Sequence, residues 1–264
     1  SRASMAIMGA EVLGIPIESI YPQVAATDAV GHCDVTGGSR TTLATGQAVI
    51  QAADELVAEL CRRVALEWDV PEDEVMWSDG AAHHGEKSLS FKDLASRASA
   101  MGGPLTVSSS LNSTSASPGF GVHICDAEVD KETGRTTITR YTVIQDAGKA
   151  IHPTYVEGQM QGGAAQGIGW ALNEEYVYND QGVLQNAGFL DYRIPVASDL
   201  PFIDTVIVEV PNPLHPYGVK GVGEVPIVPP MPAVAQAVFN SGNIRVMDLP
   251  LNPAKVAAAI IEGP

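Results

Sequence analysis

The spacing of apolar residues predicts several helices along the chain. The clearest extends from Thr45 to Trp68, where Val49, Leu56 and Val64 fall on one helical face and charged residues on the other. Shorter helices are predicted over residues 2–13, Ser90 to about Ala100, Thr154–Leu172, Met231–Asn240 and Pro253–Ile261. Ser90 with Asp93 has the pattern of a capping box, and Asn252 before Pro253 is typical of a helix start.

Alternating apolar and polar residues predict strands between these helices. Val122–Val129 and Thr136–Asp146 flank a short polar turn, which predicts a long hairpin. Weaker strand signals lie at Ile20–Ala25, on both sides of Asp79-Gly80, in a hairpin around Asn179–Gly182, and at Thr205–Val210, which is expected to be buried. Because strands and helices interleave without a regular βαβ period, we expect a mixed α+β fold and not a doubly wound sheet.

A segment of low complexity divides the chain. Ser108–Gly121 consists mainly of Ser, Asn, Thr, Pro and Gly, which is typical of a connection. The 264 residues are enough for two lobes that share one function. We therefore expect a first lobe over residues 1–112 and a second over residues 113–264.

Composition narrows the classes of partner. The formal net charge is −16, and the 15 Lys and Arg residues form no cluster, which argues against nucleic acid or an anionic membrane surface as partner. The three cysteines lie far apart and form no C-x-x-C pair, so neither a zinc ribbon nor an iron–sulfur cluster is expected here. With no long apolar stretch and no signal peptide pattern, the expected location is the cytoplasm.

A loop before the long helix has the composition of an anion-binding loop. Two glycines let the backbone approach a ligand, and hydroxyl groups and an arginine can hold phosphate or pterin oxygens. The helix that follows adds the partial positive charge of its N-terminus. The residues are Gly37, Gly38, Ser39, Arg40, Thr41 and Thr42. A helix-capping loop with a surface arginine remains the alternative.

The predicted helix Thr154–Leu172 is unusually rich in glycine. Glycine costs about 1 kcal/mol in a helix interior, so a run of them requires a reason. One reason is tight packing against a neighbouring element. The other is the close approach of a large ligand, with Gln166 exchanging hydrogen bonds with it. Both interpretations stay open on the sequence alone.

A single glutamate marks the third candidate stretch. Glu224 follows the glycine-rich segment Gly221, Val222 and Gly223 and precedes an apolar, proline-rich run. Such neighbours are expected to shield the carboxylate from water, as a general base requires. An exposed loop glutamate is the alternative.

Taken in order, these stretches resemble the C-terminal portion of the molybdenum hydroxylases, the xanthine dehydrogenase and aldehyde oxidase family. The points of resemblance are G-G-S-R-T-T with T-G-Q-A-V, then G-Q-M-Q-G-G-A-A-Q-G-I-G-W-A-L-N-E-E, D-Y-R-I-P and K-G-V-G-E-V-P. They cover nearly the whole chain. The resemblance implies one molybdopterin-binding domain made of the two expected lobes.

The resemblance also implies roles for individual residues. The loop Gly37–Thr42 corresponds to a cofactor-binding loop, Gln47 lies where it can assist, and Gln166 matches a glutamine that hydrogen-bonds the pterin. Gly221–Gly223 would approach the molybdenum through their backbone, and Glu224 would be the catalytic base. In this family the pterin dithiolene holds the metal, so no protein side chain is expected as a ligand. The pterin is either the plain phosphate or a cytosine dinucleotide form.

Other parts of such an enzyme are expected on partner chains. The opening residues Ser1 and Arg2 resemble the end of a further cofactor loop, which suggests a split gene or a cleaved precursor. The upstream molybdopterin-binding half would then be a separate chain. The family's [2Fe–2S] clusters and FAD would lie on an iron–sulfur subunit and a flavin subunit.

Several activities remain compatible with the sequence. The resemblance favours hydroxylation of an aldehyde or a purine-like N-heterocycle with water as the oxygen source, but it does not select the substrate. A carbon monoxide dehydrogenase or a hydroxybenzoyl-CoA reductase type stays open. So do a scaffold or assembly subunit without cofactor and, less favoured, a quinone-dependent dehydrogenase subunit.

Overall fold

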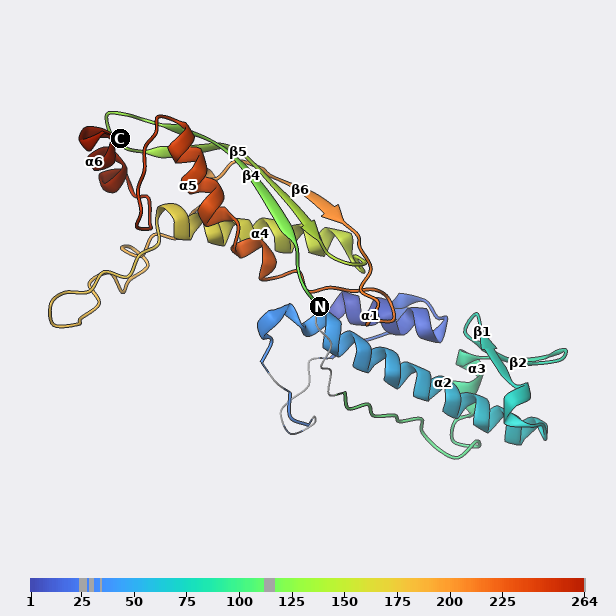
Figure 1. The fold of residues 1–264 in the computed structure, drawn as a ribbon. Helices are drawn as coiled ribbons and strands as arrows, with labels where there is room; N and C mark the ends of the chain where they lie inside the picture. The colour runs from blue at the N-terminus through green and yellow to red at the C-terminus, as the bar shows by residue number, and fades with distance from the viewer. Residues whose placement is uncertain (24–27, 29–30, 34, 112–116, 264) are drawn as a thin grey trace. The chain divides into compact units, whose positions relative to one another are not determined.

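The computed structural model describes residues 1–23, 28, 31–33, 35–111 and 117–263. The chain forms two compact units (Figure 1). Unit 1 comprises Ser1–Ala116 with Pro213–Pro216, and unit 2 comprises Ser117–Asn212 with Tyr217–Pro264. The expected α+β class is confirmed by the helices and two three-stranded sheets. The predicted boundary between residues 112 and 113 lies outside the described residues and stays a prediction.

Two helices form the frame of unit 1. Helix α1 (Arg2–Leu13) ends at Gly14, and α2 (Gly46–Trp68) ends at Asp69, both in the left-handed conformation that stops a helix. The helices pack side by side, because Gly46 leaves room for Met8: a Cβ at Gly46 would lie 2.8 Å from the Met8 Cε atom. Both helices were predicted from their apolar spacing, and both are confirmed.

A small sheet and a short helix cover the end of α2. Strands β1 (Met76–Ser78), β2 (Ala81–His84) and β3 (Lys87–Ser90) are antiparallel, which confirms the strand pair predicted around Asp79-Gly80. Helix α3 (Phe91–Arg97) starts as predicted, with the Asp93 amide donating to Ser90 Oγ, but it ends three residues early. The core below it contains Leu60, Val64, Ala82 and Leu94.

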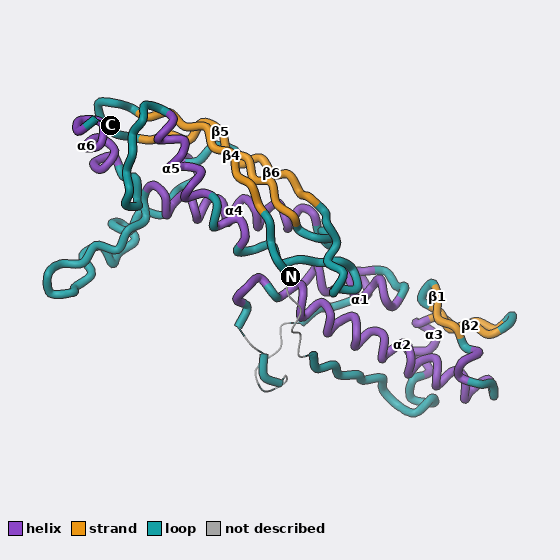
Figure 2. Tube along the Cα trace, in the orientation of Figure 1, coloured by secondary structure: helices purple, strands orange, loops and turns teal. Residues whose placement is uncertain are grey.

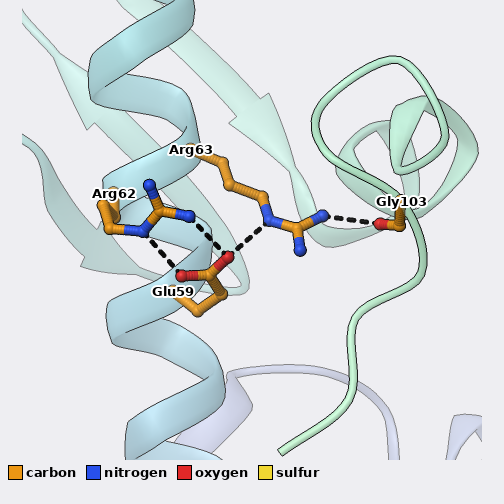
Figure 3. Close-up of polar contacts among 4 residues, drawn as sticks. All are labelled: Glu59, Arg62, Arg63 and Gly103. Atoms are coloured by element: carbon orange, nitrogen blue, oxygen red, sulfur yellow. Dashed lines mark hydrogen bonds and ion pairs between the residues drawn. The ribbon is translucent and has the colours of Figure 1, made fainter.

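Charged groups on α2 tie the segment after α3 to this core (Figure 3). Glu59 accepts hydrogen bonds from Arg62 and Arg63, each with an Nε–carboxylate distance of 2.7 Å. Arg63 also donates to the Gly103 carbonyl at 2.6 Å. The two guanidinium groups lower the pKa of Glu59 to about 2. Because Arg63 is mostly buried, it holds the chain after α3 against α2.

One predicted strand of unit 1 is wrong. Ile20–Gln23 contain no strand, and the last two residues of the predicted segment lie outside the described residues. Pro22 lacks a backbone N–H group and cannot donate to a sheet ladder, which disfavours a strand at this position.

Unit 2 is a three-stranded sheet with helices on one face (Figure 2). Strands β4 (Gly121–Val129) and β5 (Thr136–Asp146) form the predicted antiparallel hairpin, and β6 (Ile203–Val208) pairs parallel to β5. The connection from β5 to β6 contains α4 (Pro153–Leu172). Helices α5 (Pro230–Asn240) and α6 (Pro253–Glu262) follow, and Asn252 caps α6 as predicted by accepting from the Lys255 amide.

The core of unit 2 lies between this sheet and α4 and α5. Its deeply buried members include Tyr141, Val143, Met160, Ile168, Val234 and Val238. The expectation of a fully buried strand at Thr205–Val210 is wrong: β6 starts at Ile203 and alternates between buried and exposed residues. The strand is at the edge of the sheet and α4 covers one face only, so Val206 and Val208 stay exposed.

A long irregular arm joins α4 to η5 (Ala197–Asp199) and is visible as the ochre loop in Figure 1. Of the hairpin predicted around Asn179–Gly182, the turn is present, because the Asn179 side chain accepts hydrogen bonds from two following amides, but its flanks form only one isolated bridge, Tyr178 to Leu184, and no strands. Phe189 and Leu190 are exposed on this arm. In the part of the chain that the structure describes, no helix has both the length and the apolar character needed to cross a bilayer.

Candidate functional site

The predicted anion-binding loop of unit 1 has an unusual backbone. Gly37–Ser39 form a 3-10 turn in which Gly38 has φ of 74° and Ser39 has φ of 57°. Arg40 follows, and Thr41–Thr45 form a π-helical turn that runs directly into α2. Left-handed non-glycine residues and π-helical turns both concentrate at functional sites. This backbone geometry agrees with the predicted role of the loop in ligand binding, which stays a prediction.

The glycines of this loop are open to a ligand. A Cβ built on Gly38 would meet no described atom within 4 Å, and one on Gly37 would meet only Val35 Cγ1 at 3.8 Å. Neither glycine is therefore required by packing among the described residues. Gln47 differs, because its side-chain amide donates to the Leu214 carbonyl at 2.9 Å within unit 1. Its amide nitrogen is thus engaged by the protein.

The N-terminal residues lie in the same unit. Ser1 and Arg2 are exposed at the start of α1, and the Ser1 carbonyl accepts from the Met5 amide at 3.0 Å. Helix α1 contacts the π-helical turn Thr41–Thr45. Their expected part in a further cofactor loop stays a prediction.

In unit 2, the glycines of α4 differ in their surroundings. Gly163 and Gly167 face η6 (Val225–Ile227): a Cβ on Gly167 would lie 2.5 Å from the Ile227 carbonyl oxygen, and one on Gly163 would overlap Pro226. These glycines serve packing. A Cβ on Gly158 or Gly162, by contrast, would meet no described atom within 4 Å.

Gln166 belongs to the open part of α4. Its side chain is exposed, as are Gly162 one turn earlier and Gly158 two turns earlier. Residues four apart lie on the same helical face, so the glycines leave space beside the glutamine amide. This face therefore has both room for a large ligand and a group that can hydrogen-bond it.

The segment Gly218–Glu224, here called the Glu224 turn, lies against α4 through the η6 residues that follow it. Gly218, Val219 and Lys220 pair through their backbone with the chain just after β5. Beyond them, the Gly221 amide donates to Ser117 Oγ and the Val222 carbonyl accepts from Gln145 Nε2, both at 3.1 Å. The backbone is thus held on both sides of the turn.

Glu224 itself is exposed in this chain. Of the two interpretations that the sequence left open, the exposed loop glutamate is the one that agrees with this chain, and its apolar neighbours do not bury the residue. The physical reason is that Val225 and Pro226 turn toward Gly119 and Gly163 and pack there, leaving the carboxylate uncovered.

A buried ion pair lies under this turn. Lys220 Nζ is 2.6 Å from Asp146 Oδ2, and both side chains are only 9% exposed. The other Asp146 oxygen accepts from the amides of Gly148 at 2.9 Å and Val210 at 3.1 Å. Burial opposes ionisation of Asp146, but the hydrogen bonds and the lysine charge outweigh it and lower the pKa of the carboxyl group.

Sequence reasoning missed Asp146, Lys220 and Gln145. Asp146 and Gln145 end a strand, 74 or more positions before Lys220, and no periodic pattern links them. The local signal is weak: the predicted strand Thr136–Asp146 alternates well but ends in two polar residues, one of them charged. Polar groups that become buried at such a position need partners.

The donors offered by these residues suit a phosphate-bearing pterin. Open glycine backbone, hydroxyl groups and Arg40 provide donors for phosphate, and the Gln166 amide can donate and accept. The described residues contain no group of three or more His, Cys, Asp or Glu side chains arranged to bind a metal ion. Residues 1–2 and 37–42 belong to unit 1, whereas Gln166 and the Glu224 turn belong to unit 2, where η6 links them.

Comparison with known proteins agrees with a pterin-binding role for these residues. Residues 1–201 match the family model of a molybdopterin cofactor-binding domain. The xanthine dehydrogenase molybdenum-binding subunit of Escherichia coli O157:H7 is 38% identical over 175 residues, which are 65% of this chain and 23% of the relative. The carbon monoxide dehydrogenase large chain of Afipia carboxidovorans is 31% identical over 249 residues, 89% of this chain and 31% of the relative.

Solved structures give the same result at the level of the fold. Quinoline 2-oxidoreductase from Pseudomonas putida 86 superimposes with a TM-score of 0.86 and 28% identity, over 100% of this chain and 35% of that chain. A Cu,Mo-carbon monoxide dehydrogenase also gives 0.86, at 27% identity, over 99% of this chain and 34% of that one. The chain thus spans between about a quarter and a third of the length of the relatives it matches. It belongs to the molybdenum hydroxylase family and corresponds to the C-terminal part of the family's molybdopterin-binding large subunit.

Proposed function

We propose that this chain is part of a molybdenum-dependent hydroxylase or dehydrogenase. It would bind the molybdenum–pterin cofactor and supply Glu224 as the base for oxidative hydroxylation of an aldehyde or an N-heterocycle, with water as the oxygen source. The observation that carries the proposal is the Glu224 turn: an exposed carboxylate on a backbone held on both sides, next to a helix with an open glycine face.

The cofactor, when bound, supplies the two-electron redox chemistry. The chain's own residues bind and orient it. Amides and hydroxyl groups of Gly37–Thr42, together with Arg40 and the N-terminus of α2, would hold its phosphate. Gln166 would hydrogen-bond the pterin, and Ser1 and Arg2 would contribute to a further cofactor loop. Gly221–Gly223 would present backbone groups close to the metal, which takes no ligand from the described side chains in this proposal.

Glu224 would take up the proton that water loses as its oxygen is added to the substrate carbon. A positioned general base contributes about 100- to 10,000-fold to a rate. Because Glu224 is exposed in this chain, its dry surroundings would come from cofactor, substrate and the rest of the protein.

The complete enzyme would include partners. The relatives are named as a molybdenum-binding subunit, a large chain and a large subunit, which supports a multi-subunit assembly for this chain as well. We propose an iron–sulfur subunit with [2Fe–2S] clusters and an FAD subunit as partners. The pterin would be the plain phosphate or the cytosine dinucleotide form, and the assembly would be cytoplasmic.

A carbon monoxide dehydrogenase type is the second candidate. The likeness of the chain to carbon monoxide dehydrogenase, over nearly its whole length, favours it. Turnover assays with carbon monoxide beside aldehydes and N-heterocycles distinguish the two candidates, because each predicts activity toward one class only.

The deciding experiment is metal and pterin analysis of the assembly purified with its partners, together with Glu224→Gln. We expect about one molybdenum per copy of this chain, and a loss of turnover of about 100-fold or more in the variant at unchanged molybdenum content. An intact assembly without molybdenum would instead support a scaffold subunit. Near-normal turnover in Glu224→Gln would remove the base from the mechanism.

A further inference from the structure

The backbone entering the Glu224 turn is fixed to the end of β5. The Gly218 carbonyl accepts from the amides of Lys149 at 2.8 Å and Asn212 at 2.9 Å, and the Lys220 amide donates to the Ala147 carbonyl at 3.2 Å. These bonds determine where the turn begins. These bonds do not reach residues 221–224, the last of which is Glu224, so other contacts must hold that part of the turn in one conformation.

Two buried side chains of β5 hold the turn at Lys220 and at Val222, on either side of Gly221. Asp146 pairs with Lys220, four positions before Glu224, and Gln145 donates to the carbonyl of Val222, two positions before it. Gln145 is fully buried. Both carboxylate oxygens of Asp146 are satisfied, one by Lys220 Nζ and the other by two backbone amides. The pair is therefore geometrically fixed, unlike a solvated surface ion pair.

The chain after Glu224 is fixed as well. Val225 packs on Gly119 and Gly121, and Pro226 packs on Gly163 of α4. The glutamate is thus an exposed side chain between two anchored backbone segments. Turnover depends steeply on the position of a catalytic group, so that a displacement of about 1 Å can cost about 100-fold in rate.

We propose that Asp146 and Lys220 form a positioning pair for Glu224, assisted by Gln145: the buried ion pair fixes the turn that carries the base. The proposal rests on the proposed function of Glu224 and adds to it residues that do not touch the reacting atoms. An ion pair that served stability alone could be replaced by neutral side chains without loss of rate.

The test compares single and double variants in the assembled enzyme. Lys220→Met leaves a buried carboxylate without its cation, so both thermal stability and kcat are expected to fall. The double variant Lys220→Met with Asp146→Asn removes both charges, and its thermal stability is expected to recover. Its kcat should nevertheless stay about 10- to 100-fold low, with KM within about 2-fold and unchanged molybdenum content.

Lys149→Met is the matched control. Lys149 lies three residues after the end of β5 and pairs with Glu209 at 3.0 Å, but these two side chains are 55% and 38% exposed, unlike those of the buried pair. Its kcat should equal that of the unmodified enzyme. Hydrogen exchange gives a readout apart from activity: amides of residues 218–224 should exchange faster in the double variant and normally in Lys149→Met.

The outcomes separate the two proposals. A double variant that recovers kcat together with thermal stability, or keeps normal exchange in the turn, overturns the positioning role while an inactive Glu224→Gln preserves the proposed function. Normal turnover in Glu224→Gln overturns both. The positioning pair is supported if the double variant is stable and carries molybdenum but has a low kcat and faster amide exchange at residues 218–224.

Discussion

The two loops assigned to cofactor and substrate chemistry are built in opposite ways. The Glu224 turn of unit 2 is anchored by backbone pairing, a buried ion pair and glycine contacts with α4. The loop Gly37–Thr42 of unit 1 keeps open glycines and a left-handed Ser39. A carboxylate that moves a proton needs one position, whereas backbone amides that bind phosphate only need access. Anchoring therefore distinguishes the two loops.

The largest change in the free energy of unfolding is expected when Gly→Ala is made at a packed position of α4 and compared with the same substitution at an open position. At Gly167 the new methyl group would meet the Ile227 carbonyl of η6 at 2.5 Å and the Pro230 ring, at the start of α5, at 2.7 Å, so it would displace one or both of these elements. Overpacking costs about 1–3 kcal/mol, partly offset by about 1 kcal/mol of helix propensity. We expect Gly167→Ala to lower the free energy of unfolding by about 1–2 kcal/mol.

Gly162→Ala is the control, because a methyl group there meets no described atom. It should raise the free energy of unfolding by about 0.5–1 kcal/mol in the protein without cofactor. Denaturant unfolding of both variants measures the difference. Equal effects at the two positions would show that the glycines of α4 do not anchor the turn by packing.

The sequence predicted the elements whose signals are local. The apolar spacing of α2, the alternation of β4 and β5, and the caps at Ser90 and Asn252 depend on neighbours within a few residues, and the structure confirms them. Motif order also identified the family. The residues assigned to the cofactor stay predictions, although the structure shows the local geometry of each.

The rest depends on contacts between distant segments. Nothing near Lys220 indicates that Asp146 will be its partner, and nothing in the glycine run of α4 separates Gly163 and Gly167 from the open Gly158 and Gly162. For the same reason, the sequence left open whether Glu224 is shielded or exposed. Apolar neighbours in sequence do not shield a side chain when they pack in another direction.

Acid is expected to weaken the framework of the Glu224 turn. His123 on β4 lies with Nδ1 2.9 Å from Tyr141 Oη, and burial lowers the pKa of His123 to about 4. Since the unfolded value is about 6.5, the unfolded chain binds the proton first as the pH falls. This contribution to stability is complete above about pH 6.5 and is lost as the pH falls toward 4.

The loss should amount to about 1–2 kcal/mol, after a discount for the partial exposure of His123. Urea unfolding at several values between pH 4 and 7 measures it. His123→Gln should reduce the loss of stability between pH 7 and 4, whereas His83→Gln, in the β2–β3 hairpin of unit 1, should leave that loss unchanged. If His123→Gln lost as much stability in acid as the unmodified protein, the acid sensitivity would belong to other groups.

The smallest effect is expected in the open loop, where packing plays no part. Gly38 has φ of 74° and no described atom near its Cβ position, so Gly38→Ala should cost only the conformational penalty of a left-handed residue, about 1 kcal/mol. Its neighbour Gly37 is not left-handed, and Gly37→Ala should be neutral or gain a few tenths of a kcal/mol. Denaturant unfolding of the two neighbours, without cofactor, measures both values. A cost of about 3 kcal/mol or more at Gly38 would reveal packing around this loop and end the contrast with the anchored turn.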